Sequence, residues 1–218
     1  MNRREFSVQL AGIAGAAALA SLGLPNIAFA APGTPVEGKD YDKLKTPVPV
    51  NKDGKIEVIE FFWYGCPHCY AFEPVIEPWA ATVPEDVRFH RVPVAFDALK
   101  EIHQQIYYTW EALGLVAQMH GKTFIRFHVD HKPINREADM LAFAQDSGLD
   151  VAKVKAAWNS FSVASKMRAA KQLSDDYEID GVPELGIQGR FTTAPSMGGP
   201  LNAIATTDYL VNVIRKGG

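Results

Sequence analysis

Two dense runs of apolar and β-branched residues in the first half of the chain predict strands. The first runs from Lys55 to Phe62 and is apolar on both faces, as expected of a strand buried inside a sheet. The second runs from Val87 to Val94, where Pro93 indicates either the end of the strand or an edge position. The segment between them, Cys66 to Ala81, is helical in character, and its two internal prolines predict a kink or a break.

The pattern changes at Asp97, and from there to about Ser174 apolar residues recur at helical spacing. Pro133 and Gly148 divide this stretch into several helices. Asn135 is the expected N-cap of the helix that covers Arg136 to Ser147. The stretch is therefore expected to be entirely helical.

The last part of the chain predicts a β-hairpin followed by a helix. Glu184 to Gln188 and Arg190 to Thr193 are the two strands, and Gly189 supplies the turn between them. Thr206 to Lys216 is the closing helix. The order of elements is strand, helix, strand, helical block, hairpin and helix, which predicts an α/β fold.

The N-terminus has the pattern of an export signal. A short basic region, Arg3-Arg4, precedes an uncharged apolar run from Val8 to Leu24, and Ala28-Phe29-Ala30 has the small-x-small pattern of a cleavage site. We expect a signal peptide of residues 1–30, cleaved after Ala30; a retained membrane anchor is the alternative. Arg3-Arg4-Glu5-Phe6 also resembles the twin-arginine signal but lacks the basic residue usual after it, so the export route stays open. Either route takes the protein out of the cytoplasm.

Composition narrows the function classes. With 218 residues, 47% hydrophobic and 22% charged, the chain has an ordinary globular balance, which excludes a disordered, collagen-like or coiled-coil protein. A net charge of −3 provides no electrostatic footprint for nucleic acid. The two cysteines, Cys66 and Cys69, are too few for a disulfide framework or a four-cysteine zinc site. They point to chemistry instead.

The segment Cys66-Pro67-His68-Cys69 follows a strand and opens a helix, so both sulfurs share one face of the first turn. Pro67 suits this turn because its missing N–H has no helical partner there. Cys66 lies where free backbone N–H groups and the positive end of the helix dipole favour a thiolate. His68 adds a donor and, when protonated, a positive charge. Stabilising the thiolate stabilises the dithiol, which makes the disulfide a stronger oxidant.

Two other uses of the cysteine pair carry less weight. A structural disulfide across so short a loop would remove little chain entropy. A zinc site would need further ligands, for which His120, His128 and His131 are the candidates, although a histidine in a helical region usually lies on the surface or caps a helix. We expect no metal at this site.

Glu60 is the one charged residue in the apolar core of the first strand, Val58 to Phe62, and we expect it to be buried. A buried, unpaired carboxylate has a raised pKa and can hold or pass a proton. One hypothesis is that Glu60 relays protons for Cys69. The other is that Glu60 reaches a lysine such as Lys55 or Lys100, and the sequence favours neither.

These residues resemble the thioredoxin superfamily, in which a redox-active Cys-x-x-Cys opens a helix that faces a cis-proline loop. Pro74 matches the kink proline of that helix. Within the superfamily the chain is similar to the DsbA family of periplasmic thiol:disulfide oxidases. Cys66-Pro67-His68-Cys69-Tyr70 is that family's active-site signature, Glu60-Phe61-Phe62 matches its acidic strand, Val182-Pro183 its Val–cis-Pro pair, and the segment 156–161 the end of its inserted helical domain.

The resemblance implies a thioredoxin fold split by an all-helical insertion. The expected divisions are a signal peptide (1–30), an irregular N-terminal arm (31–54), a thioredoxin-fold domain (55–96 and 175–218) and a helical insertion domain (97–174). It also implies that Pro183 is cis and that, with Val182, it presents backbone to an extended substrate strand.

The resemblance further implies the reaction. A substrate thiolate attacks Cys66 of the Cys66–Cys69 disulfide, and the substrate's second thiol resolves the mixed disulfide. The substrates would be reduced exported proteins in the periplasm, and a quinone-linked membrane partner of the DsbB type would reoxidise the enzyme. No soluble cofactor and a monomeric state are expected.

Several residues depart from the family pattern, and more than one function fits the cysteine pair. Trp63 is bulkier than usual before the first cysteine, Glu184 puts a charge beside the substrate path, and Gly186 is expected to loosen its strand. These residues are expected to affect substrate preference. They leave open the alternative that the enzyme acts on one dedicated partner and not on many proteins. The same cysteines would also serve a disulfide reductase or isomerase, or a periplasmic metallochaperone.

Overall fold

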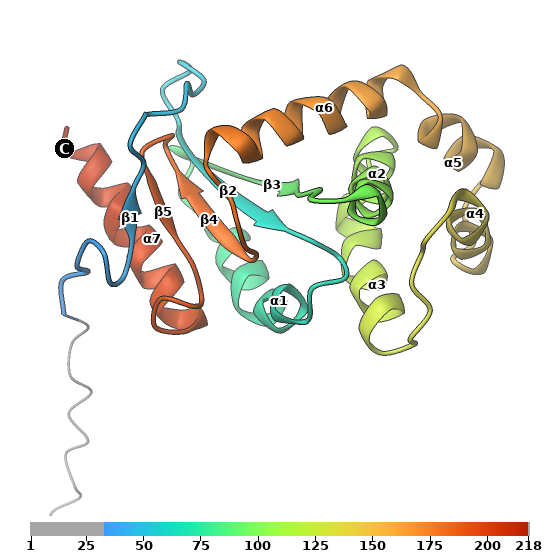
Figure 1. Ribbon diagram of the computed structural model, residues 1–218, viewed down its shortest axis with the longest axis horizontal. Coiled ribbons are helices and arrows are strands. Elements are labelled where there is room, and N and C mark those ends of the chain that lie inside the picture. Colours follow the sequence, from blue (N-terminus) through green and yellow to red (C-terminus); the bar gives the residue numbers. More distant parts are fainter. Residues whose placement is uncertain (1–32, 218) are drawn as a thin grey trace, which may run out of the picture. The chain divides into compact units, whose positions relative to one another are not determined.

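In the computed structural model, which describes residues 33–217, a mixed five-stranded sheet organises the fold (Figure 1). The strand order is β1-β5-β4-β2-β3. β2 pairs in parallel with β3 and antiparallel with β4, and the β4–β5 and β5–β1 pairs are antiparallel. The strands are β1 (Asp42–Lys43), β2 (Ile56–Phe62), β3 (Val87–Pro93), β4 (Glu184–Ile187) and β5 (Phe191–Thr193).

β2 is the buried inner strand that its sequence predicts. It has neighbours on both sides, and all seven of its residues are buried. β3 lies at the edge of the sheet and ends at Pro93, so both interpretations of that proline hold. A proline at the last residue of an edge strand removes no ladder hydrogen bond.

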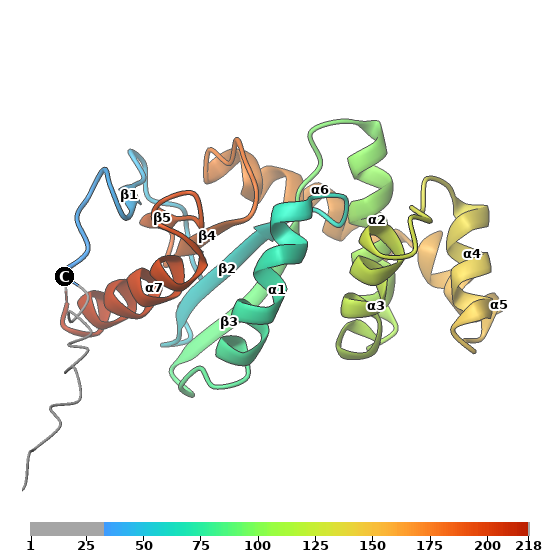
Figure 2. The same ribbon diagram turned by 90° about the horizontal axis from the view of Figure 1, so that it is seen from below.

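One face of the sheet is covered by α1 (Pro67–Ala80) and α7 (Pro200–Arg215), as Figure 2 shows. Their apolar side chains form one core with β2, β4 and β5, in which Phe72 and Ile76 of α1 meet Leu210 of α7. α1 is a continuous helix although Pro74 and Pro78 lie inside it. α7 begins six residues before the expected Thr206, because Pro200 opens its first turn directly after Gly199.

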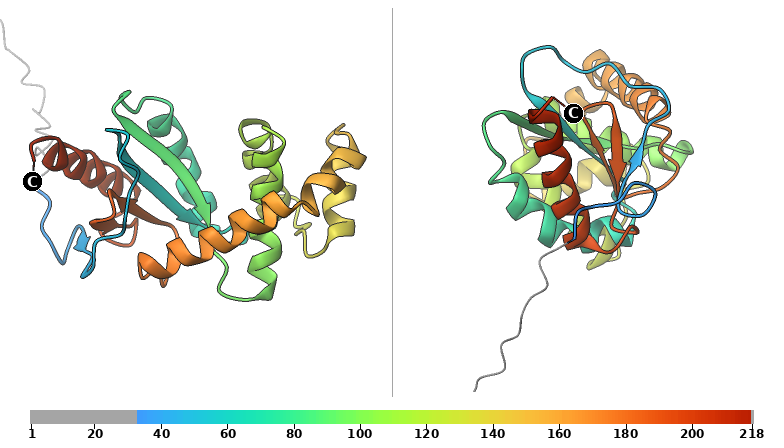
Figure 3. Two further views of the ribbon diagram at one scale, coloured as in Figure 1. Left: turned by 90° about the horizontal axis from the view of Figure 1, so that it is seen from above. Right: turned by 90° about the vertical axis from the view of Figure 1, so that its left-hand side faces the viewer.

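Five helices lie between β3 and β4 in the chain, in the region expected to be helical (Figure 3). They are α2 (Ala98–Ala112), α3 (Val116–His128), α4 (Glu137–Asp146), α5 (Val151–Trp158) and α6 (Phe161–Asp176). Large side chains such as Trp110, Met119 and Phe124 are fully buried between them. The second core of the protein includes these residues and the other face of β2.

The expected cap at Asn135 is wrong. Arg136 is the N-cap residue of α4, and no side chain caps the helix there. The backbone N–H of Asn135 instead donates to the carboxylate of Asp139, 3.2 Å away. The first-turn carboxylate thus reaches back to the chain before the helix.

The arm before β2 is less irregular than predicted, since it contains β1, and Val48 within it is buried. The hydroxyl of Thr193 donates to the carbonyl of Asp40, which holds the arm on β5. The predicted signal peptide, residues 1–30, lies outside the described residues. None of the helices in the described part combines the length and apolar character needed to cross a membrane.

Gly186, which the sequence led us to expect to loosen β4, lies at a closely packed position of that strand. A Cβ at this position would lie 2.5 Å from a ring carbon of Tyr177 and 3.1 Å from one of Phe61, and both rings are buried. The absence of a side chain therefore lets Tyr177 pack closely on the sheet, and its hydroxyl accepts a hydrogen bond from the backbone N–H of Gly189. Glycine serves close packing at this position.

We predict that Gly186→Ala lowers the free energy of unfolding by about 1–3 kcal/mol, because the added methyl group overpacks a buried ring contact. Gly121→Ala is the matched control, since Gly121 lies inside α3 with nothing within 4 Å of its added Cβ. That variant should gain about 0.5–1 kcal/mol. Urea unfolding of both variants measures the difference, and equal stability of the two would contradict the packing role of Gly186.

Candidate functional site

The cysteine pair lies at the start of α1, where β2 ends. Cys66 is the N-cap residue of the helix, and its sulfur accepts a hydrogen bond from the backbone N–H of Cys69 at 3.4 Å. Pro67 occupies the first helical turn, as its lack of an N–H permits. Both cysteines are free thiols. Local sequence therefore determines this geometry: a strand, a short turn and a helix that begins at the first sulfur.

The first thiol is the acidic one. The pKa of Cys66 is lowered to about 6, first by the hydrogen bond from the Cys69 side chain. The backbone N–H groups of Cys69 and His68 and the charge of His68 act in the same direction, while burial opposes them. His68 itself is exposed. A thiolate at Cys66 is thus stabilised by donors that the helix terminus provides.

The second thiol is held protonated. Cys69 has no exposed surface, and burial raises its pKa far above the ordinary value for a thiol. The neighbouring Cys66 and the charge of Glu60 raise it further. The two sulfurs of one helical turn therefore differ in protonation at neutral pH, with Cys66 as the thiolate and Cys69 as the thiol.

The loop before β4 faces the first thiol. The Val182–Pro183 peptide bond is cis, as the resemblance implies, and the thiol of Cys66 donates to the carbonyl of Val182 at 3.4 Å. A groove of about 480 Å³ begins beside this contact. Its lining is mostly apolar, with acidic groups at Asp180 and Glu184, and includes His68, Ala71, Phe72, Val182, Pro183, Ala194, Pro195 and Pro200.

Trp63 and Glu184, two of the three departures from the family pattern, lie close to this loop and thiol. The ring of Trp63 covers Gly65, where a Cβ would lie 2.4 Å from it, and its N–H donates to His103 at 2.6 Å. Glu184 is half-buried, and burial raises its pKa to about 7, with Asp180 and Asp42 adding to the effect. The groove therefore has two acidic side chains in its lining, and Trp63 is anchored by His103 over Gly65, the residue before Cys66.

Glu60 is fully buried, as predicted, but it is not unpaired. Its Oε2 accepts a hydrogen bond from Nε of Arg91 at 2.7 Å, so the partner is neither Lys55 nor Lys100. Arg91 lies directly opposite Glu60 in the parallel β2–β3 register. Burial raises the pKa of Glu60 to about 7 although Arg91 opposes the rise, and the Oε1 atom has no hydrogen-bond partner.

Arg91 also contacts two carboxylates of α1. Its Nη2 lies 2.8 Å from Oε1 of Glu77 and 3.9 Å from Oε1 of Glu73. Burial raises the pKa of Glu73 to about 7, and Glu77 adds to the rise. One guanidinium, on a side chain that is 9% exposed, thus lies within 4 Å of three carboxyl groups from two elements.

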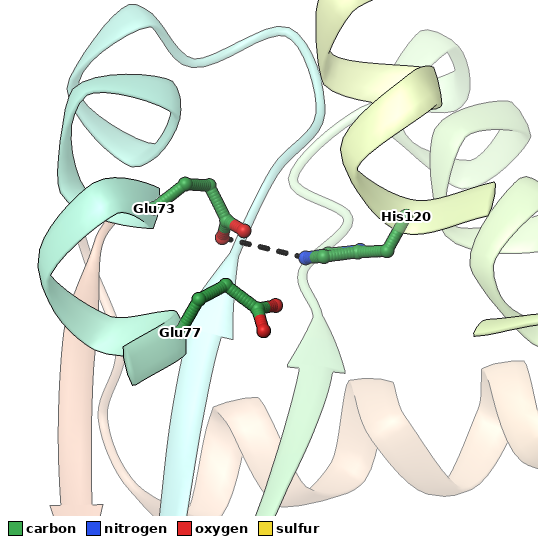
Figure 4. Close-up of side chains that lie close together, drawn as sticks. All are labelled: Glu73, Glu77 and His120. Atoms are coloured by element: carbon green, nitrogen blue, oxygen red, sulfur yellow. Dashed lines mark hydrogen bonds and ion pairs between the residues drawn. The ribbon is translucent and has the colours of Figure 1, made fainter. Parts of the chain in front are cut away.

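His120 of α3 completes this network, as Figure 4 shows for its contact with Glu73. It is 3% exposed, whereas its sequence context predicted a surface position. Its place in the apolar face of α3, between Met119 and Phe124, is the signal that could have identified it. The two other histidines considered as ligands lie elsewhere: His128 contacts the carbonyl of Tyr64, and His131 is exposed.

Glu73, Glu77 and His120 place three metal-ligand atoms within 4.8 Å of one another, and no other such group occurs among residues 33–217. Arg91 already supplies the positive charge for these carboxylates. A divalent cation there would face a buried guanidinium at close range, which is electrostatically costly. The set is therefore better described as a charge network around Arg91 than as a metal centre.

The fold and the cysteine pair define a thioredoxin-like thiol:disulfide oxidoreductase. Residues 76–201 match the DSBA-like thioredoxin domain family. The chain is 41% identical over 175 residues to the thiol:disulfide interchange protein DsbA of Pseudomonas aeruginosa, covering 80% of this chain and 83% of the relative. It is 43% identical over 180 residues to the Azotobacter vinelandii protein of the same name, covering 82% and 84%.

Solved structures agree with these relatives. The crystal structure of Pseudomonas aeruginosa DsbA superimposes with a TM-score of 0.80 at 39% identity, covering 83% of this chain and 94% of that one. The oxidoreductase DsbA from Xylella fastidiosa gives 0.78 at 27% identity, covering 84% and 99%. The chain belongs to the DsbA family and is a thiol:disulfide oxidoreductase that donates disulfides.

We predict that the reduced protein shows a thiolate with a titration midpoint near pH 6, followed by its ultraviolet absorbance. His68→Phe should raise the midpoint by less than about one pH unit, because it removes the weakest of the contributing effects. Because the folded pKa is the lower one, the thiolate stabilises the reduced fold above about pH 8.5 and loses this contribution as the pH falls through about 6.

Cys66→Ser is the control for this titration. It leaves only Cys69, whose raised pKa should remove the signal over the whole neutral range. A midpoint near the ordinary thiol value of about 8.5 in the unmodified protein would contradict the assignment of the thiolate to the helix N-terminus.

Proposed function

We propose that Cys66 is the sulfur that exchanges with substrate, and that the Cys66–Cys69 disulfide is donated to reduced exported proteins. The observation that carries this proposal is the difference between the two thiols, with a pKa of about 6 at Cys66 and a strongly raised pKa at Cys69. A thiolate that is stable at neutral pH is a good leaving group and makes its disulfide oxidising.

The reaction has two exchange steps. A substrate thiolate attacks Sγ of Cys66, the Cys66–Cys69 bond breaks, and the sulfur of Cys69 leaves with the electron pair and takes up a proton. The second substrate thiolate then attacks the substrate sulfur of the mixed disulfide, and Cys66 leaves as a thiolate. The substrate loses two electrons and forms its disulfide, while the protein gains them as a dithiol.

Glu60 is the proposed proton donor and acceptor for Cys69. The charge of Glu60 raises the pKa of Cys69, so the two groups interact electrostatically. A pKa of about 7 lets Glu60 both give and take a proton at neutral pH, which suits a general acid–base group. Pairing with Arg91 restrains the carboxylate without abolishing that capacity.

The substrate segment is proposed to bind along the cis-proline loop. Val182 already accepts a hydrogen bond from Cys66 through its carbonyl, so backbone at this loop is directed at the reacting sulfur. An extended segment would pair its backbone with this loop and place side chains in the groove beside Phe72 and Pro183. Asp180 and Glu184 would then lie beside that segment.

The remaining parts of the proposal concern the cellular setting. Residues 1–30 would direct export to the periplasm, where a quinone-linked membrane partner of the DsbB type would reoxidise the dithiol. The protein would act as a monomer without a soluble cofactor. Segments 55–96 and 175–218 would form the catalytic thioredoxin domain, and residues 97–174 the helical domain.

The test of the proposal is the redox equilibrium of the cysteine pair with glutathione at neutral pH, followed by intrinsic fluorescence. We predict a reduction potential well above the value of about −270 mV that is typical of thioredoxin, with about 1.4 kcal/mol in favour of the dithiol for every 30 mV. A value near that of thioredoxin would move the assignment to a reductase or isomerase.

Titration of the reduced protein with zinc and with copper is the control for this measurement. Weak or no binding is expected, because the cysteine pair lacks further ligands and the group of Glu73, Glu77 and His120 already contains Arg91. Tight stoichiometric binding at the cysteine pair would favour a metallochaperone.

We predict that Glu60→Gln removes the inflection near pH 7 from the rate at which a peptide disulfide oxidises the reduced protein. The matched control is Glu57→Gln, because Glu57 is also buried in β2 but lies on the opposite face of the sheet. An unchanged pH profile in Glu60→Gln would refute the relay, and equal changes in both variants would attribute the effect to the strand.

A further inference from the structure

His120 connects the helical region to the buried charges in a way that the exchange mechanism above does not use. Its Nδ1 lies 2.9 Å from the hydroxyl of Tyr64. Its Nε2 lies 3.4 Å from Oε1 of Glu73, the contact that Figure 4 shows as a dashed line. Tyr64 stands two residues before Cys66, and Glu73 belongs to the helix that Cys66 opens. The imidazole therefore touches both segments that flank the reactive turn.

The surroundings of His120 determine which of its nitrogens carries the proton. Burial and the charge of Arg91 lower the pKa of His120 to about 3, so the ring is neutral and has a single N–H. Burial raises the pKa of the Tyr64 hydroxyl well above its ordinary value, so the hydroxyl keeps its proton. Above its pKa of about 7, Glu73 is ionised and only accepts hydrogen bonds, which assigns the N–H to Nε2 and lets Nδ1 accept from Tyr64.

We propose that His120 is a positioning residue for the reaction: its Nε2–H holds the Glu73 carboxylate in its charged form beside Arg91, which limits the share of the Arg91 charge that reaches Glu60. This inference rests on the role of Glu60 given above. By this inference, a residue on α3, far in sequence from the cysteine pair, helps to set the pH at which Glu60 releases its proton.

The direction of the effect follows from the contacts. Glu73 competes with Glu60 for Arg91, since the guanidinium contacts both, and the charge of Glu73 raises the pKa of Glu60. A donor on Glu73 favours its charged form. His120 thereby lowers the pKa of Glu73 and, through Glu73, raises the pKa of Glu60. A direct charge on His120 would lower the pKa of Glu60, but with a pKa of about 3 the ring carries no charge at neutral pH.

Other groups around the imidazole are accounted for. Glu77 of α1 lies within the same cluster and contacts Arg91, and Tyr107 of α2 packs its ring against that of His120. Burial raises the pKa of Tyr107, so this phenol stays neutral. The titrating groups that face His120 near neutral pH are therefore the carboxylates that share Arg91.

The test compares His120→Leu, which removes the donor at similar side-chain volume, with His120→Gln, which keeps an N–H near the position of Nε2. Both are measured by the ¹³C shifts of glutamate side-chain carboxyl carbons as a function of pH, in the whole reduced protein. In His120→Leu we expect the pKa of Glu73 to rise by about one pH unit and that of Glu60 to fall. His120→Gln should stay close to the unmodified protein.

Opposite movement of the two carboxylates is the decisive result. A mere loss of polarity or packing would raise both pKa values together, and that outcome, or the same change in both variants, would overturn the proposal. His90→Phe is the matched control, because His90 neighbours Arg91 on β3 but lies on the other face of the strand. It should leave both carboxylates unmoved. If His120→Leu does not fold, the failure of Tyr64→Phe to shift Glu73 would count against the proposal.

The carboxyl titration does not depend on catalysis, so it separates this inference from the proposed function. If Glu60 moves in His120→Leu and the pH profile of thiol oxidation moves with it, both stand. If Glu60 moves while the pH profile does not, His120 positions Glu73 as proposed, but Glu60 is not the relay.

Discussion

One buried guanidinium holds together the charged part of this fold. Arg91 reaches from β3 to Glu60 on β2 and to Glu73 and Glu77 on α1, so the edge strand, the inner strand and the catalytic helix share one cation. A carboxylate as deeply buried as Glu60 would be neutral without a partner, and a guanidinium as buried as this one is tolerable only when paired. Removing either charge would leave the other unpaired in the core, which is strongly destabilising.

The first turn of α1 gives its two thiols opposite properties. Cys66 stands at the N-terminus of α1, where donors converge, whereas Cys69 lies one turn inward, without exposed surface. The helix terminus stabilises negative charge at the first position, and burial with the nearby charge of Glu60 opposes it at the second. Position along a single helical turn thus separates the acidic sulfur from the buried one.

Sequence patterns predict those elements whose structure is determined by residues close together in the chain. The buried strand β2, the helix that opens at Cys66 and the hairpin after Pro183 follow from residue order, because apolar runs, proline and glycine act within a few residues. The partner of Glu60 could not be predicted in this way, since Arg91 faces it only through the β2–β3 register, which the chain sets over a long separation.

His120 shows the same limit more strongly. Its neighbours in the sequence place it on an apolar face of α3, but the groups that give it a role, Tyr64 and Glu73, come from segments far away in the chain. The expected cap at Asn135 fails for a related reason, since its side-chain Oδ1 lies 3.5 Å from Nε2 of His103 on another helix. The hydrogen-bond partners of a polar side chain depend on the tertiary structure, whereas apolar periodicity can be read directly from the sequence.

The number of protons taken up on reduction links the two thiols to the carboxyl groups around Arg91. Between the pKa of Cys66, about 6, and the much higher one of Cys69, reducing the disulfide places one proton on the pair and not two. That proton must reach a sulfur that has no exposed surface, and this is the step for which Glu60 is proposed as the relay. Two carboxylates with pKa values of about 7 share Arg91 in this part of the core, and Glu77, half-exposed, connects the same guanidinium to the surface. A guanidinium that served Glu60 alone would hold it ionised and remove its capacity to carry a proton. Sharing Arg91 among several carboxylates keeps Glu60 poised between its two states.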